Sequence, residues 1–120
     1  MTEALEVQVV TDAGAARLAL AGEIDRDADG ALGSAYDEAV GTGATSIRLD
    51  FSDVSYINST GIALIVGLLG RARAADIPVS AYGLSDHYRE IFEITRLSDF
   101  ITIDDGGAAA QPIAPEGSAG

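Results

Sequence analysis

The sequence contains no cysteine and no lysine, and each absence excludes a class of site. Without cysteine the chain can form neither a disulfide nor a thiolate metal site, and a reducing compartment is the natural expectation. Without lysine the Gly-x-x-x-x-Gly-Lys-Ser/Thr phosphate-binding loop cannot be present. Arginine therefore supplies all of the permanent positive charge, at seven positions.

Long apolar runs are also missing. The longest, Ile62–Leu69, is far below the roughly 20 residues that span a bilayer. The first residues, Met1 to Glu6, have no basic segment followed by an apolar core, so we expect no secretory signal. At 120 residues the chain is long enough for one domain with its own core. We expect a soluble, cytoplasmic protein.

Positive charge is scarce overall. The chain has seven arginines against 19 acidic residues, so its formal net charge is −12. Nucleic-acid binding depends largely on basic residues that neutralise phosphates, so this balance argues against it. The same balance disfavours an anionic membrane surface. It favours a basic protein partner, since complementary fields accelerate association.

Hydrophobic periodicity predicts an α/β fold. Period-two alternation, turn residues and apolar stripes at spacings of three and four give the order β-β-α-β-α-β-α-β. The strands are expected at Glu6–Val10, Arg17–Gly22, Ile47–Phe51, Pro78–Tyr82 and Phe100–Ile103, and the helices at Ala28–Val40, Ser59–Ala75 and from Ser85 to about Thr95. Strands separated by helices pair in parallel, and the initial hairpin makes the sheet of about five strands mixed.

Two features of this pattern bear on the limits of the domain and on its surface. Residues 105–120 contain almost no bulky side chain, so we expect a domain over 1–104 and a disordered tail after it. The second helix is apolar nearly all round until Arg71, which indicates complete burial or an apolar face for a partner. Leu64 and Leu68 are the candidates for that face. Gly30 and Gly33 each weaken the first helix by roughly 1 kcal/mol relative to alanine. Gly67 and Gly70 either permit close packing of the second helix or weaken it.

Polar residues interrupt two apolar segments at Asn58-Ser59-Thr60-Gly61, where the second helix should begin. An ordinary N-cap accounts for one such residue. Hydroxyls at this position also lie beside free backbone N–H groups and the positive end of the helix dipole, which would stabilise an attached phosphate. Gly61 would let another backbone approach closely.

Other chemistry has weaker support. His87 is the only histidine and no Gly-x-Ser-x-Gly turn is present, which argues against a serine hydrolase. Carboxylates could bind a metal in so acidic a chain, but Asp25, Asp50, Asp53 and the pair Asp104–Asp105 have no recognised ligand spacing. We expect no metal and no cofactor.

Three segments together resemble one family. Residues 49–65, Leu-Asp-Phe-Ser-Asp-Val-Ser-Tyr-Ile-Asn-Ser-Thr-Gly-Ile-Ala-Leu-Ile, are similar to the signature of STAS domains, the anti-sigma factor antagonists. Gly22-Glu-Ile-Asp25 is similar to the family's Gly-Glu-Leu/Ile-Asp after the second strand. Residues 89–97 are similar to its later helix. The likeness covers roughly residues 5–104 in the correct order.

The resemblance implies a STAS-like fold and a non-enzymatic regulator. Such a protein binds a kinase-type anti-sigma factor with a GHKL-type ATPase fold and displaces the sigma factor. The partner phosphorylates the first hydroxyl of the turn, here Ser59 with Thr60 as the second choice, and a PP2C-type phosphatase reverses this. By the same resemblance Glu23 and Asp25 contact arginines of the partner. The full expected docking set is Glu23, Asp25, Asn58, Ser59, Thr60, Gly61, Ile62 and Leu64.

One position departs from the family pattern. Asn58 stands where the family usually has aspartate. Asparagine caps a helix as well as aspartate does, but it removes a negative charge beside Ser59 and so bears on how a kinase engages it. Asn58, Leu64 and Leu68 therefore motivate an alternative, a constitutive STAS scaffold in a larger signalling assembly without a phosphorylation switch. A stable homo-oligomer, such as a homodimer, would favour it. A small-ligand or lipid-carrier accessory domain is a third hypothesis, which requires a pocket.

Overall fold

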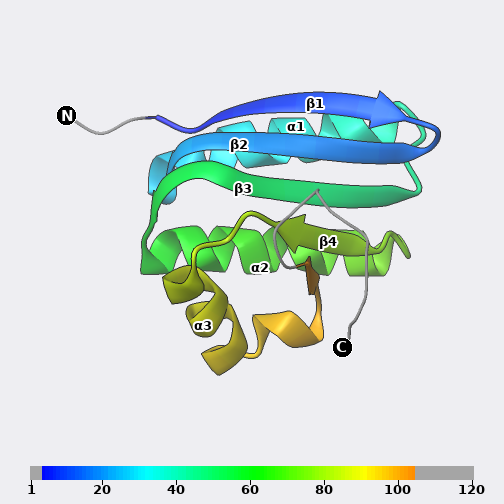
Figure 1. Ribbon diagram of the computed structural model, residues 1–120. Coiled ribbons are helices and arrows are strands. Elements are labelled where there is room, and N and C mark those ends of the chain that lie inside the picture. Colours follow the sequence, from blue (N-terminus) through cyan, green and yellow to red (C-terminus); the bar gives the residue numbers. More distant parts are fainter. Residues whose placement is uncertain (1–3, 105–120) are drawn as a thin grey trace.

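The computed structural model describes residues 4–104, and the predicted order of strands and helices is confirmed within it (Figure 1). Two short 3₁₀ helices, η1 and η2, are additional. The predicted disordered tail at 105–120 lies outside the described residues. The elements are β1 Glu6–Asp12, β2 Ala15–Ile24, η1 Arg26–Ala28, α1 Asp29–Gly41, β3 Ser46–Ile57, α2 Ser59–Ala74, β4 Val79–Tyr82, α3 Asp86–Ile94, η2 Leu97–Asp99 and β5 Thr102–Asp104.

The strands form one five-stranded sheet in the order β1-β2-β3-β4-β5. β1 and β2 are antiparallel, whereas every other neighbouring pair is parallel. The β1–β2 turn has positive φ at both central residues, 53° at Ala13 and 85° at Gly14, which suits a two-residue hairpin. The predicted mixed α/β sheet is therefore confirmed.

The helices cover one face of the sheet. In β2 the side chains of Leu18, Leu20 and Ile24 are buried while the intervening residues are more exposed. Helices α1 and α2 lie side by side on the face to which these residues point (Figure 1). From α3 the Phe92 ring meets the Phe51 ring edge-on, with the centroids 5.9 Å apart. The core thus lies between one sheet face and the helices.

The opposite face of the sheet carries charged groups, and contacts join some of them across neighbouring strands. Arg17 lies 3.5 Å from the Asp50 carboxylate, and the Arg48 guanidinium lies 4.3 Å from the centroid of the Tyr82 ring. Burial by itself would raise the pKa of Asp50, but hydrogen bonds from Ser52 and Tyr82 and the charge of Arg17 hold that pKa below its usual range. These contacts hold neighbouring strands together.

β3 is longer than its alternation predicts. It was expected to end at Phe51 and instead continues to Ile57. The register against β2 shifts twice, so Ala19 and Ala21 face Asp50 and Asp53, and Gly22 and Glu23 face Val54 and Tyr56. Each shift inserts an extra residue in β3, and such bulges break the alternation from which a strand is recognised.

The second helix also differs in part from its prediction. Of the two candidates for an exposed apolar face, Leu68 is buried, with only 6% of its surface accessible, and Leu64 is half-buried. The reason is that α1 lies alongside α2 and covers the side that does not face the sheet. The motive for an exposed leucine face on α2 is therefore removed.

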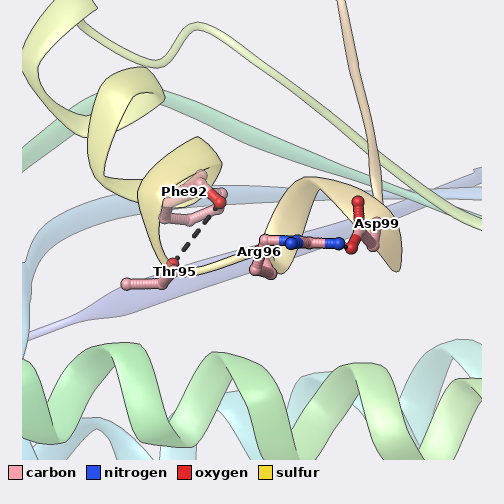
Figure 2. Close-up of polar contacts among 4 residues, drawn as sticks. All are labelled: Phe92, Thr95, Arg96 and Asp99. Atoms are coloured by element: carbon pink, nitrogen blue, oxygen red, sulfur yellow. Dashed lines mark hydrogen bonds and ion pairs between the residues drawn. The ribbon is translucent and has the colours of Figure 1, made fainter.

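Polar contacts close the end of α3 and turn the chain toward β5 (Figure 2). The Thr95 hydroxyl donates to the carbonyl oxygens of Ile91 at 2.7 Å and Phe92 at 3.4 Å. Arg96 has a left-handed φ of 67°, and its Nε lies 2.9 Å from Asp99 Oδ2. The η2 turn follows, and the last strand is Thr102–Asp104, which begins two residues and ends one residue later than predicted.

Candidate phosphorylation and docking site

Two of the family-like segments meet where β2 and β3 end. Glu23 is paired with Tyr56 and Ile24 with Ile57 in parallel register. The backbone N–H of Asn58 then donates to the carbonyl oxygen of Ile24, at 3.2 Å. Because parallel strands have their carboxyl ends at the same edge, the segment 22–25 lies next to the segment 58–61.

Gly61 fixes this junction. A Cβ built on Gly61 would lie 1.9 Å from the carbonyl oxygen of Ile24 and 2.7 Å from its carbonyl carbon. No side chain fits between two backbones at that separation. The expected close backbone approach is thus confirmed, and its partner is the last residue of β2. Gly61 is buried, so it shapes the site from beneath.

Asn58 caps α2. Its side-chain Oδ1 accepts a hydrogen bond from the Gly61 N–H at 2.8 Å, and its carbonyl accepts the Ile62 N–H at 2.9 Å. The helix therefore begins at Ser59, as predicted. Since the cap is supplied by Asn58, the hydroxyls of Ser59 and Thr60 are not needed for it, and both residues are exposed.

We expect Asn58→Ala to lower the free energy of unfolding by about 1 kcal/mol, because one helix N–H loses its acceptor. Asn58→Asp should retain the cap and stay close to the wild type. Ser59→Ala should change stability by less than about 0.5 kcal/mol, as is usual for a surface position. Urea denaturation followed by circular dichroism measures all three. A larger loss for Ser59→Ala than for Asn58→Ala would contradict the assignment of the cap.

The surroundings of Ser59 are acidic. Glu23 and Asp25 are half-buried at the same edge of the sheet, and Asp25 Oδ1 accepts the Asp27 N–H at 3.0 Å to begin η1. Between Asp50 and Gly70 the sequence has no basic residue. A phosphate on Ser59 would gain from the helix dipole, but it would add negative charge next to existing carboxylates.

The predicted docking residues come together at this edge. Ser59 and Thr60 are exposed, and the half-buried members are Glu23, Asp25, Asn58, Ile62 and Leu64. Only Gly61 is buried. Apart from Gly61, the set presents a surface that a protein can reach, although its role in docking stays a prediction.

Sequence reasoning missed the part that Tyr88 plays. Along the third helix, the spacing of Tyr88, Ile91, Phe92 and Thr95 predicts an inward stripe. It does not predict that the Tyr88 hydroxyl accepts the N–H of Ile57, at 3.0 Å. This bond ties α3 to the last residue of β3, directly before Asn58. The stripe indicated burial, but the acceptor role needs the placement of β3, which local pattern does not give.

Within residues 4–104 the structure adds no support for a metal site or for a serine hydrolase. Across residues 4–104 no three His, Asp or Glu side chains gather as a metal site. His87 is exposed, and its ring lies edge-on to Tyr88 with the centroids 4.9 Å apart. None of the helices within the described range is long and apolar enough to cross a membrane.

Comparison with known proteins decides the family. The model of the family described as "Mlab, STAS domain" matches residues 7–103, nearly the whole described range. The chain belongs to the STAS domain family. The fold agrees, because solved structures of anti-sigma factor antagonists align with most of this chain.

The individual relatives are anti-sigma factor antagonists. The Anti-sigma-B factor antagonist of Listeria monocytogenes is 42% identical over 57 residues, which cover 48% of this chain and 50% of the relative. That of Staphylococcus aureus is 36% identical over 64 residues, covering 53% and 59%. The chain therefore matches only half to three-fifths of the length of these curated relatives.

Solved structures extend the likeness over the fold. An anti-sigma factor antagonist from Mycobacterium paratuberculosis aligns with a TM-score of 0.66 at 21% identity, over 83% of this chain and 85% of that one. The Bacillus cell fate determinant SpoIIAA in its phosphorylated form aligns with a TM-score of 0.62 at 24% identity, over 84% and 91%. At these identities the match concerns the fold of the STAS domain.

Proposed function

We propose that this STAS domain is an anti-sigma factor antagonist regulated at Ser59. In its unmodified form it binds a kinase-type anti-sigma factor and so releases a sigma factor. The partner phosphorylates Ser59 and thereby ends the interaction, and a PP2C-type phosphatase restores it. The domain acts by binding and has no catalytic step of its own.

The exposure of Ser59 at the start of α2 is the observation that carries this proposal. The hydroxyl is accessible to a kinase, its helix N-terminus tolerates a phosphate, and the half-buried Glu23 and Asp25 lie at the same edge. The names of the curated relatives support the choice of partner. SpoIIAA, which shares the fold, has been solved in unphosphorylated and phosphorylated forms.

The charges of the site explain how the switch would work. The carboxylates of Glu23 and Asp25 attract basic groups of a partner, as the net charge of −12 also does over longer range. A phosphate adds about −1.5 to −2 charges and must lose its hydration inside the interface. The helix dipole stabilises the phosphate in the free and the bound state alike, so the lost hydration and the misplaced charge inside the interface are what favour the dissociated state.

Phosphorylation can be tested directly with purified components. Each anti-sigma factor kinase of the source organism is incubated with the chain and Mg-ATP, and the product is measured by intact-mass spectrometry. We expect one kinase to add a single phosphate to the wild type and to Thr60→Ala, and none to Ser59→Ala. A PP2C-type phosphatase should return the original mass.

The controls separate binding from modification. Ser59→Ala should still bind the same kinase in a titration, because the residue is exposed and does not supply the cap. If the phosphate were found on Thr60 while Ser59 stayed unmodified, the phosphorylation site would be Thr60 and not Ser59. Absence of both binding and modification with every kinase would overturn the proposed function. It would favour the constitutive scaffold, and light scattering would then test whether the chain forms a homo-oligomer.

A further inference from the structure

A groove lies between α1 and α2, beyond the set of residues expected to dock. Its volume is about 200 Å³. The apolar part of its lining comes from both helices, with Leu32 and Tyr36 on α1 and Leu64 and Leu68 on α2. Small-molecule sites usually have about 300–1,000 Å³, so this groove is better matched to a single inserted side chain.

Two glycines keep the groove open. Gly33 of α1 and Gly67 of α2 both line it, and a Cβ built on either meets no atom within 4 Å. The glycines therefore do not serve a close contact between the helices. Each glycine weakens its helix by roughly 1 kcal/mol relative to alanine, and the space that an alanine methyl group would take is empty in the folded domain. An occupant from outside would fill that space.

The charges along the groove select a cation. Arg71 lines the groove but is already engaged, because its guanidinium lies 2.6 Å from the Asp37 carboxylate and 4.4 Å from the centroid of the Tyr36 ring. Asp29 also lines it, is exposed, and has no ion pair with any residue between 4 and 104. The charge that remains available to an incoming group is therefore negative.

The groove is continuous with the surface around Ser59. Ser59, Ala63 and Gly67 follow each other at intervals of four along α2, so they lie on one face of the helix. All three are exposed, and the last two line the groove. A protein that covers Ser59 would therefore also cover the groove, whose near end begins one turn further along the helix.

We propose that the groove receives an arginine side chain of the anti-sigma factor, an inference that rests on the function proposed above. The apolar stem of the arginine lies against Leu32 and Leu64, and its guanidinium pairs with Asp29. Arginine suits this place because it combines a long apolar stem with a planar charge, and it is enriched among the residues that dominate interface energies.

The test fills the groove without disturbing the fold. Gly67→Gln introduces a good helix former whose side chain occupies the groove. Gly70→Gln is the matched control, since Gly70 is one turn away in the same helix, is equally free of atoms within 4 Å, and does not line the groove. Both variants should be at least as resistant to urea as the wild type, because glutamine replaces glycine in a helix.

Affinity is then measured by calorimetric titration with the purified anti-sigma factor that binds the wild type. We expect about tenfold weaker binding for Gly67→Gln, equivalent to about 1.4 kcal/mol, and less than about twofold change for Gly70→Gln. Asp29→Asn should also weaken binding about tenfold. Arginine-to-alanine variants of the anti-sigma factor should include one that weakens binding to the wild type but hardly weakens it further to Asp29→Asn.

The possible failures are distinguishable. If the wild type binds no anti-sigma factor, the proposed function falls and this inference falls with it. If the wild type binds but Gly67→Gln binds equally well, or Gly70→Gln loses as much, the groove is not occupied and the function stands. If filling the groove weakens binding while Asp29→Asn does not, the occupant is not the proposed arginine.

Discussion

Ser59→Asp is expected to bind the anti-sigma factor about 100-fold more weakly than the wild type does, a loss of about 2.7 kcal/mol. The new carboxylate would lie at the exposed start of α2, next to the edge that carries Glu23 and Asp25. A partner that is complementary to those acidic groups would have to bury an additional unpaired charge, and such misplaced charges cost several kcal/mol at an interface. Calorimetric titration measures the loss.

Ser59→Asn is the matched control, because its side chain has nearly the shape of aspartate without the charge. We expect it to bind within a fewfold of the wild type. Stability must not account for the difference. An acidic residue in the first turn of a helix is stabilising by about 0.3–1 kcal/mol, so Ser59→Asp should unfold at a slightly higher urea concentration. Equal weakening by Asn and Asp would show that shape, and not charge, controls docking.

Among the glycine-to-alanine substitutions in α2, Gly61→Ala should be the most destabilising. We expect it to lower the free energy of unfolding by about 3 kcal/mol or more. Its Cβ would be placed 1.9 Å from the Ile24 carbonyl oxygen, and the obstacle is backbone, which cannot rotate away. The start of α2 would have to separate from the end of β2. The hydrogen bond from Asn58 N to Ile24 O would be strained or lost as well.

The same substitution at another glycine of α2 should change the free energy of unfolding in the opposite direction. Gly67→Ala adds its Cβ where no atom lies within 4 Å, and alanine is the better helix former, so we expect a gain of about 0.5–1 kcal/mol. Urea unfolding of both variants under one set of conditions gives the comparison. Similar effects at the two positions would mean that Gly61 does not mediate the contact between β2 and α2.

Much of the fold could be predicted from local pattern. The hairpin, the crossover helices and the caps depend on periodicity and on residues such as Ser85, whose hydroxyl oxygen accepts the Tyr88 N–H at 3.2 Å as its position suggested. Pattern failed where tertiary contacts override it. The bulges of β3 hide its second half from an alternation test, and the burial of Leu68 depends on the neighbouring α1.

The site was predictable to a similar extent. The run Asn58-Ser59-Thr60 indicates the start of a helix, because such residues are favoured at N-caps. The likeness of segment 22–25 to the family drew attention to Glu23 and Asp25. Segment 22–25 meets the start of α2 because β2 and β3 pair in parallel register. The same register brings Gly61 close to Ile24. The groove was not foreseen, because Gly33 and Gly67 lie on different helices and only the packing of α1 on α2 brings them to one cavity.

In the proposed function, the acidic groups, the exposed hydroxyl of Ser59 and the open groove receive a basic partner on one edge of the domain. The residues that hold this edge in place, Asn58, Gly61 and Tyr88, are distinct from those that face outward. Because the support is separate from the surface, a phosphate can be added without disturbing the fold. The effect of modification should therefore appear in binding and be nearly absent from stability.

The most direct measurement is a calorimetric titration of the anti-sigma factor with two preparations of the same chain, one unmodified and one phosphorylated at Ser59 to completion as judged by intact mass. The account predicts tight binding by the first and about 100-fold weaker binding by the second, with recovery after phosphatase treatment. Equal affinity of the two preparations would contradict it.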